Sequence, residues 1–310
     1  MKNVADIYPL TPTQAGILFH TLRSPEEEVY FQQISCTLEG QLDITKFQHA
    51  WDEVVKRHPP LRTIFLWEGV DEPLQVVRET VTVPWEVIDL RGSTPQEQID
   101  QLDKLRLAYR ERGFNLTKAP ILHMVLACLA DERYVFIWNF HHILTDGWST
   151  HQVFNEAFLI YEALVRGEMV AASPVRPFRD YINWLMQQDQ EAAERYWVDQ
   201  LKGFDEPTPF QVDKPPQGKA IKHGEISLEL SSSTSSALQQ IAKGNRVTLN
   251  TLILGAWGIL LSRYSGDDDV VFGTTLSGRP ADLRGVESMI GMLINTLPLR
   301  IRVKAVSYTH

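Results

Sequence analysis

The 310-residue sequence contains only two cysteines, Cys36 and Cys128. Two thiols cannot build a disulfide framework or a cysteine-based zinc site, which excludes small secreted disulfide-rich folds and zinc fingers. Both cysteines lie inside strand-like runs, where a thiol packs as a small apolar group. We therefore expect two reduced core cysteines, as in a cytosolic protein.

The sequence also lacks a hydrophobic run long enough to cross a bilayer. Its longest apolar stretches, such as TLILGAWGILL at 251–261, fall well short of the roughly 20 residues that a spanning helix needs. The opening MKNVADIYPL has no apolar segment of a secretory signal. These two absences predict a cytoplasmic protein with no membrane contact.

The sequence also has fewer basic residues than acidic residues. The sequence has 30 Lys and Arg residues against 39 Asp and Glu residues, a formal net charge of −9. No basic block interrupts this acidity, so we expect no nucleic-acid-binding surface. The sequence also has no glycine-rich phosphate loop and no spaced set of metal ligands, so we expect neither a metal nor a directly bound cofactor.

Apolar periodicity predicts a first unit in which helices alternate with the strands of a sheet. The helices are expected at 11–22, 44–58 and 149–165, and the strands at 30–40, 63–69, 73–79, 121–130 and 134–144.

A second mixed α/β unit is expected to follow. Proline-containing stretches at 169–178 and 204–220 are typical of a linker and a long loop. A helical pair is expected at 179–202, further helices at 233–242 and 248–264, and strands at 224–230, 269–276 and 294–303. Two such units leave a cleft between them, where substrates commonly bind.

Two adjacent histidines follow the apolar run within NFHHILTDGWS (139–149). Side chains alternate across a strand, so His141 and His142 point in opposite directions and only one can face a given site. An imidazole can take or give a proton near neutral pH. Asp146 could orient an imidazole or pair with an arginine, and Gly147 allows either a sharp turn or a close substrate approach. An isolated HxxxD pattern is also typical of buried polar residues that are hydrogen-bonded within the core. A zinc site is disfavoured, because no third ligand lies at a recognised spacing.

With four companion stretches, this segment resembles nonribosomal peptide synthetase condensation domains, which have a chloramphenicol acetyltransferase-like fold. HHILTDGWS matches the HHxxxDG signature of that family. The companions, in the family's order, are YPLTPTQAGILFH (8–20), RHPPLRTIF (57–65), RDYINWLMQQD (179–189) and SGRPADLRGVESMIGMLINTLPLR (277–300). The resemblance implies two α/β lobes, 1–172 and 173–310, around a V-shaped cleft.

The resemblance also implies an acyltransferase that forms peptide bonds. Upstream donor and downstream acceptor carrier proteins would each present a substrate on a phosphopantetheine arm, with an adenylation domain adjacent. The acceptor amine would attack the donor thioester, and no cofactor would be bound directly. Because thioesters are activated acyl donors, holding both arms in attack geometry would supply most of the acceleration.

The family pattern assigns expected roles to single residues. His142 would face the cleft, position the amine and secondarily take its proton, whereas His141 would be structural. Asp146 would form an ion pair, with Arg62 as its first expected partner. Gly147 would leave room for a pantetheine arm, and its amide, near a helix N-terminus, would stabilise an oxyanion. The other residues expected to support the cleft or an ion pair are Arg279, Trp148, Ser149 and Asn295.

Relatives with other tasks remain as alternatives. Epimerisation domains share the histidine motif but typically continue with a different helix start than GWST. Non-catalytic carrier-protein docking domains usually have a damaged motif. Heterocyclising relatives replace the histidines with aspartates, which argues against them here. Within condensation domains, the residues at 8–20, DYINWLMQQDQ (180–190) and PTPF (207–210) resemble the subtype that joins two L-residues.

The end of the sequence, RIRVKAVSYTH, follows closely on the last predicted strand. Relative to the family, the final part of the second lobe is missing, so we expect that lobe to be incomplete. We also expect low or absent turnover from these 310 residues alone. The last few residues are expected to be foreign to the natural protein.

Overall fold

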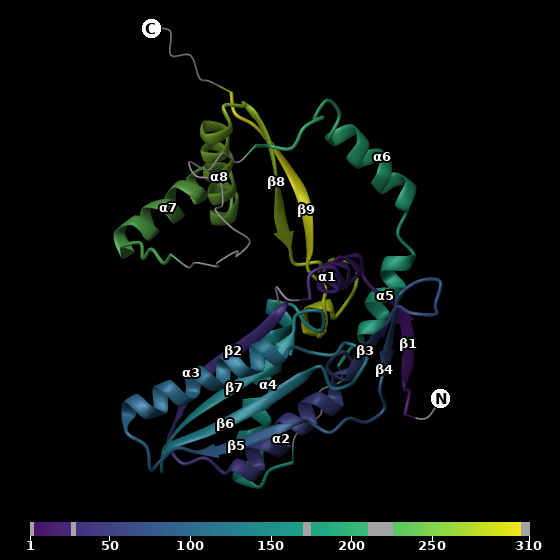
Figure 1. Ribbon diagram of the computed structural model, residues 1–310. Helices are drawn as coiled ribbons and strands as arrows, with labels where there is room; N and C mark the ends of the chain where they lie inside the picture. Colours follow the sequence, from purple (N-terminus) through teal and green to yellow (C-terminus); the bar gives the residue numbers. More distant parts are fainter. Residues whose placement is uncertain (1–2, 26–28, 170–174, 210–225, 305–310) are drawn as a thin grey trace. The chain divides into compact units, whose positions relative to one another are not determined.

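The computed structural model describes residues 3–25, 29–169, 175–209 and 226–304 (Figure 1). The chain separates into two compact units. Unit 1 comprises Met1–Gln188 and Leu276–Asn295, and unit 2 comprises Asp189–Thr275 and Thr296–His310. Each unit combines helices with strands, which confirms the expected α/β class.

Unit 1 contains two sheets. Its strands are β1 (Asp6–Pro9), β2 (Phe31–Glu39), β3 (Thr63–Leu66), β4 (Leu74–Val77), β5 (Trp85–Asp89), β6 (Leu122–Ala130) and β7 (Arg133–His141). Its helices are α1 (Pro12–Arg23), α2 (Ile44–Arg57), α3 (Pro95–Arg112), α4 (Gly147–Arg166) and α5 (Phe178–Met186). The smaller sheet has the order β1-β4-β3 and the larger sheet β2-β7-β6-β5. In the larger sheet only β5 and β6 pair in parallel.

The larger sheet is covered on both faces, and β7 shows how the sequence achieves this. Its side chains alternate, so Phe136 and Trp138 face α2 and α4, with ring centroids 5.1 and 5.2 Å from that of Trp51. Val135 and Ile137 belong to a separate buried cluster with residues of α3. A strand buried on both sides must be apolar almost throughout, which is the pattern read from the sequence.

The segment Leu276–Asn295 returns to unit 1 from far along the chain. It joins α5 and the smaller sheet in one buried cluster, made of Tyr8, Val77, Phe178, Tyr181, Ile182, Leu283, Val286, Met289 and Leu293. Helix α5, which was expected in the second lobe, therefore packs in unit 1. The compact units divide after Gln188, whereas the expected boundary at residue 172 lies outside the described residues. The V-shaped cleft remains a prediction.

Unit 2 is built from α6 (Gln190–Gln200), α7 (Ser232–Gly244), α8 (Leu249–Ser265) and a two-stranded sheet of β8 (Asp269–Leu276) and β9 (Asn295–Arg302). Arg300 Nη2 lies 2.6 Å from Asp269 Oδ2 and so ties the two strands together. The strand expected at 224–230 is wrong for its described part, because residues 226–230 pair with no strand in the described portion of the chain.

A search of the described residues finds no helix that combines the length and the apolarity needed to cross a bilayer.

The aromatic core between α2, α4 and β7 can be tested with Trp51→Ala. Trp51 is fully buried, so its truncation is expected to lower the free energy of unfolding by about 3–5 kcal/mol. Urea denaturation followed by circular dichroism measures the change. The control is Leu107→Ala on α3, whose side chain is 56% exposed; its effect should stay within about 0.5 kcal/mol. Equal effects of the two changes would contradict this packing.

Candidate functional site

His142 lies in the turn that follows β7, and one of its ring nitrogens is committed to the backbone. Nδ1 is 2.9 Å from the carbonyl oxygen of Thr145. A carbonyl only accepts hydrogen bonds, so Nδ1 carries a proton, and in the neutral form of the ring Nε2 holds the lone pair. The backbone N–H of His142 also donates to the Tyr30 carbonyl at 2.8 Å. The turn itself therefore orients a half-buried imidazole with Nε2 as its base.

His141 has the opposite tautomer. Its Nδ1 accepts the backbone N–H of Ile143 at 3.2 Å, so the neutral ring carries its proton on Nε2. That nitrogen lies 3.4 Å from Thr21 Oγ1, and the hydroxyl donates to the Ile17 carbonyl on α1. Burial, with the nearby charge of His142, lowers the pKa of His141 to about 3. His141 is thus a neutral hydrogen-bond donor that links β7 to α1.

Asp146 is fully buried and caps the N-terminus of α4. Oδ1 accepts the backbone N–H of Ser149 at 2.7 Å, and Oδ2 accepts those of Leu293 and Ile294 at 3.1 and 3.3 Å. The guanidinium of Arg279 completes the shell, with Nη1 2.9 Å from Oδ2 and Nη2 3.3 Å from Oδ1. These charge-assisted bonds replace the water that burial removes from the carboxylate.

Arg279 itself is held from several directions. Its side chain is only 4% exposed, and Nη2 also donates to Ser149 Oγ at 3.0 Å and to the Met289 carbonyl. Its guanidinium carbon lies 5.5 Å from the centre of the Trp148 ring. Gly278, just before it, has a φ of +63°, and a Cβ there would collide with the Leu293 carbonyl. The SGRP motif therefore requires glycine at position 278 for Arg279 to reach Asp146.

The expected pairing of Asp146 with Arg62 is wrong. Arg62 donates instead to backbone carbonyls: Nε to Val55 at 3.1 Å, and Nη1 to Arg78 and Glu79. No carboxylate pairs with Arg62 among the residues the structure describes. The reason is local, because Arg62 follows α2 and precedes β3, where carbonyls at the ends of α2 and β4 need donors. The ion-pair partner of Asp146 is Arg279, in the segment Leu276–Asn295.

The turn before α4 does not require a glycine at position 147. Gly147 opens α4 without the positive φ that would require a glycine. A Cβ there would meet nothing within 4 Å. The residue instead borders an open hollow of about 580 Å³, lined by Gly147, Trp148, His151, Gln152, Glu287 and Ser288. Trp148 is 54% exposed, and its Nε1 donates to the Glu287 carbonyl.

The remaining predicted support residues lie close to the same loop. Ser149 Oγ donates to the Gly291 carbonyl at 2.9 Å and accepts the Gly291 N–H at 3.1 Å. Asn295 Oδ1 lies 3.2 Å from Thr13 Oγ1, near the start of α1. The structure therefore brings Asp146, Ser149 and Arg279 into one network, with Trp148 stacked on it.

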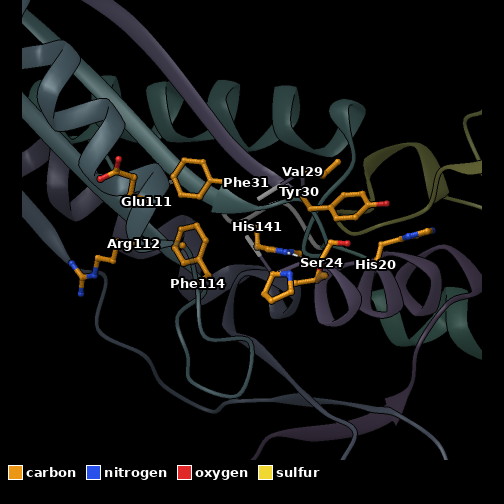
Figure 2. Close-up of a pocket in the computed structure, with 12 residues that line it drawn as sticks. His20, Ser24, Val29, Tyr30, Phe31, Glu111, Arg112, Phe114 and His141 are labelled. Carbon is orange, nitrogen blue, oxygen red and sulfur yellow. Dashed lines mark hydrogen bonds between the residues drawn. The ribbon is translucent and has the colours of Figure 1, made fainter. Parts of the chain in front are cut away.

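A second space opens beside His141 on the α3 side of the sheet (Figure 2). Its volume is about 440 Å³, and it is lined by His20, Thr21, Ser24, Pro25, Val29, Tyr30, Phe31, Glu111, Arg112, Gly113, Phe114 and His141. We call it the α1–α3 pocket. Of these residues, the sequence motifs predict only His141 as a site residue, because the others come from separate segments with no shared pattern. Across the described residues, no group of three His, Cys, Asp or Glu side chains is placed to hold a metal ion.

Comparison with known families matches residues 4–308 to the family model described as "Condensation domain".

Similar curated proteins are large synthetases. The chain is 46% identical to one of the linear gramicidin synthase subunits of Brevibacillus parabrevis, over 98% of this chain and 4% of that protein. It is 38% identical to bacitracin synthase 3 of Bacillus licheniformis, over 97% of this chain and 5% of that protein. For surfactin synthase subunit 3 of Bacillus subtilis (strain 168) the values are 35%, 97% and 24%. The chain thus spans a small part of the curated relatives it matches.

Solved structures show the same fold. The first condensation domain of the CDA synthetase matches with a TM-score of 0.77 at 21% identity, covering 97% of this chain and 70% of that one. The condensation domain from the monacolin K polyketide synthase MokA matches with a TM-score of 0.78 at 18% identity, covering 98% and 69%. Identities this low speak for the fold alone, and they confirm the expected condensation-domain fold.

The buried ion pair predicts strong coupling between its two members. Asp146→Ala and Arg279→Ala are each expected to lower the free energy of unfolding by about 3–5 kcal/mol, because each leaves a buried charge without its partner. The double variant should lose clearly less than the sum. The control cycle combines Asp146→Ala with Arg62→Ala and should be additive within about 0.5 kcal/mol. Coupling in the Arg62 cycle alone would refute the pairing.

The buried neutral His141 predicts a pH dependence of stability. Its folded pKa, about 3, lies below the unfolded value near 6.5, so the unfolded chain binds the proton first as pH falls. Relative to His141→Asn, the wild type should lose about 1.4 kcal/mol of unfolding free energy per pH unit between about pH 6 and about pH 4. Urea denaturation at several pH values tests this. Parallel pH curves would mean that His141 is not held neutral.

Proposed function

The chain belongs to the condensation domain family, and from this premise we propose that it joins two carrier-bound substrates through an amide bond. The chain covers only a small part of its synthetase relatives, so it would supply one step of a longer assembly. A donor acyl group and an acceptor aminoacyl group would each arrive on the phosphopantetheine arm of a carrier protein. The adjacent adenylation domain would load the acceptor, and no cofactor would be bound by the chain itself.

The observation that carries the proposal is the anchored ring of His142. Its Nδ1–H is held by the Thr145 carbonyl, which leaves Nε2 to accept a hydrogen bond from the attacking amine. The amine nitrogen adds to the thioester carbonyl and its excess proton passes to Nε2. When the tetrahedral intermediate collapses, the carbon–sulfur bond breaks and the departing thiolate takes that proton. Positioning the amine is the larger contribution, since the thioester is already activated.

The start of α4 supports the developing charge in this proposal. Gly147 borders an open hollow, and a Cβ would meet nothing there, so a pantetheine arm has room to pass. Its backbone amide lies in the first turn of α4, where N–H groups and the helix dipole favour negative charge. Asp146 and Arg279 act as positioning residues, because their network holds the turn between His142 and α4.

His142→Ala tests the proposal in the full-length synthetase that contains this chain. Donor and acceptor carrier proteins are loaded with amino acids, and dipeptidyl-carrier formation is followed by intact-protein mass spectrometry. The rate is expected to fall roughly 100-fold or more, because the variant loses both the positioning bond and the proton acceptor. The control is His49→Ala, an exposed histidine on α2 that pairs with Glu53, and it should keep the wild-type rate.

Each other outcome has a definite meaning. Unchanged product formation by His142→Ala would reduce this histidine to a bystander and leave proximity to carry catalysis. Inverted donor stereochemistry without an amide product would replace condensation with epimerisation. No chemistry in a folded wild-type protein that still binds both carriers would indicate a docking role.

A further inference from the structure

We propose that Gln14 and Gln75, two buried glutamines outside the histidine motif, position the turn that orients the ring of His142. The inference rests on the proposed function, because the ring orientation affects the reaction only if His142 receives the amine proton. Gln14 belongs to the stretch YPLTPTQAGILFH (8–20), to which the proposed function assigns no step. Both glutamines act on the ring indirectly, so they are positioning residues.

The side-chain amide of Gln14 is fixed in one orientation. Gln14 lies on α1 and is 1% exposed. Its Oε1 accepts the backbone N–H of Thr11 at 3.0 Å. On the other side, its Nε2 donates to the Ile143 carbonyl at 3.1 Å and to Gln75 Oε1 at 2.9 Å. Turning the amide over would set donor against donor at Thr11 and acceptor against acceptor at Ile143. The hydrogen-bond partners therefore determine the orientation.

Gln75 continues the network into the smaller sheet. It lies on β4 and is also 1% exposed. Its Nε2 donates to the carbonyl of Pro9 on β1 at 2.9 Å, so its Oε1 is left to accept from Gln14. Strands β1 and β4 pair antiparallel, which holds the backbone at both ends of this bond. One chain of hydrogen bonds therefore runs from β1 through two side chains to the turn after β7.

The carbonyl of Ile143 is well placed to control this turn. Ile143 is fully buried. A peptide unit is planar, so holding its carbonyl also holds the N–H that follows. That N–H donates to the His141 carbonyl at 3.1 Å, which closes the turn. Two residues after Ile143, the carbonyl of Thr145 accepts the Nδ1–H of His142. Gln14 therefore limits the direction in which Thr145 holds the imidazole.

Loss of the Gln14 amide would disturb the turn. A buried carbonyl without a hydrogen bond is costly, so the peptide after Ile143 is expected to rotate toward another donor. This rotation changes the backbone dihedrals next to Thr145. The carbonyl of Thr145 then moves away from Nδ1, and the ring of His142 is released.

Gln98 provides a control with the same chemistry at a distance from the turn. Its Nε2, on α3, donates to the carbonyls of Leu90 and Leu129, each at 2.9 Å. Next to Leu129, Ala130 pairs with Arg133, at the end of β7 opposite to the histidines. Removing the Gln98 amide therefore costs two hydrogen bonds to the backbone without touching the site.

The state of the ring can be measured without turnover, by nitrogen NMR of the 310-residue chain with labelled imidazoles. His142 is assigned by the loss of its signals in His142→Ala. At a pH where this ring is neutral, the wild type should show a protonated Nδ1 and an unprotonated Nε2. In Gln14→Met the difference between the two nitrogen shifts should fall to about half or less, because a released imidazole samples both tautomers. Gln75→Met leaves the bond to Ile143 in place and should give a smaller change in the same direction.

Gln98→Met should keep the wild-type shift difference. An equal change in this control would reduce the network to a general contribution to stability and overturn the proposal. An unchanged difference in folded Gln14→Met would also overturn it. If Gln14→Met does not fold, Gln75→Met decides, and an unchanged difference in that variant refutes the positioning role.

Turnover in the full-length synthetase then connects the ring orientation to the reaction. For Gln14→Met, kcat of dipeptidyl-carrier formation should fall roughly 10- to 100-fold, because a misplacement of about 1 Å can cost that much. The KM for each carrier protein should stay unchanged, since both glutamines are buried, and Gln98→Met should keep the wild-type kcat. A changed NMR signature with an unchanged kcat would overturn the positioning role while the proposed function stands. If the signature changes but the wild type forms no amide, the hold of the network on the ring stands and the proposed function falls.

Discussion

The buried carboxylate of Asp146 is the interaction on which the rest of unit 1 depends. A charge removed from water is tolerated only when every acceptor site is filled, and here Arg279 and three backbone N–H groups fill them. These donors come from the start of α4 and from the returning segment 276–295. One carboxylate thus fixes the helix start, joins two distant parts of the chain, and holds the turn in which Thr145 orients His142.

Much of this arrangement could be predicted from the sequence, because local patterns report local structure. The buried strand β7 was visible as an apolar run, and α2 and α4 as amphipathic periods. The histidine motif with its companions identified the family and the site loop. Helix α3 was missed because its surface is polar and only Leu102 is buried. Its capping box, Thr94 with Glu97 after Pro95, was the available signal.

The rest depends on contacts between segments far apart in sequence. Arg62 lies far before Asp146 in the sequence and Arg279 lies far after it. No local pattern decides which of the two arginines pairs with Asp146. The end of α2 needed a donor for its carbonyls, so Arg62 was already committed, whereas Gly278 turns the chain so that Arg279 enters the loop. The α1–α3 pocket is likewise lined by four separate segments. Helix α5 packs in unit 1 because its apolar residues complete a buried cluster there.

The pairing register of β7 has an evolutionary consequence. His141 is opposite Phe31 in the β2 ladder, and the two imidazoles differ in tautomer because Nδ1 of His141 accepts the Ile143 N–H whereas Nδ1 of His142 donates to the Thr145 carbonyl. Inserting or deleting one residue between Arg133 and His141 would exchange their faces. The base would then enter the α1–α3 pocket. Selection must therefore act on the length of this strand, so homologous chains should vary in length at exposed connections such as 67–73 and not here.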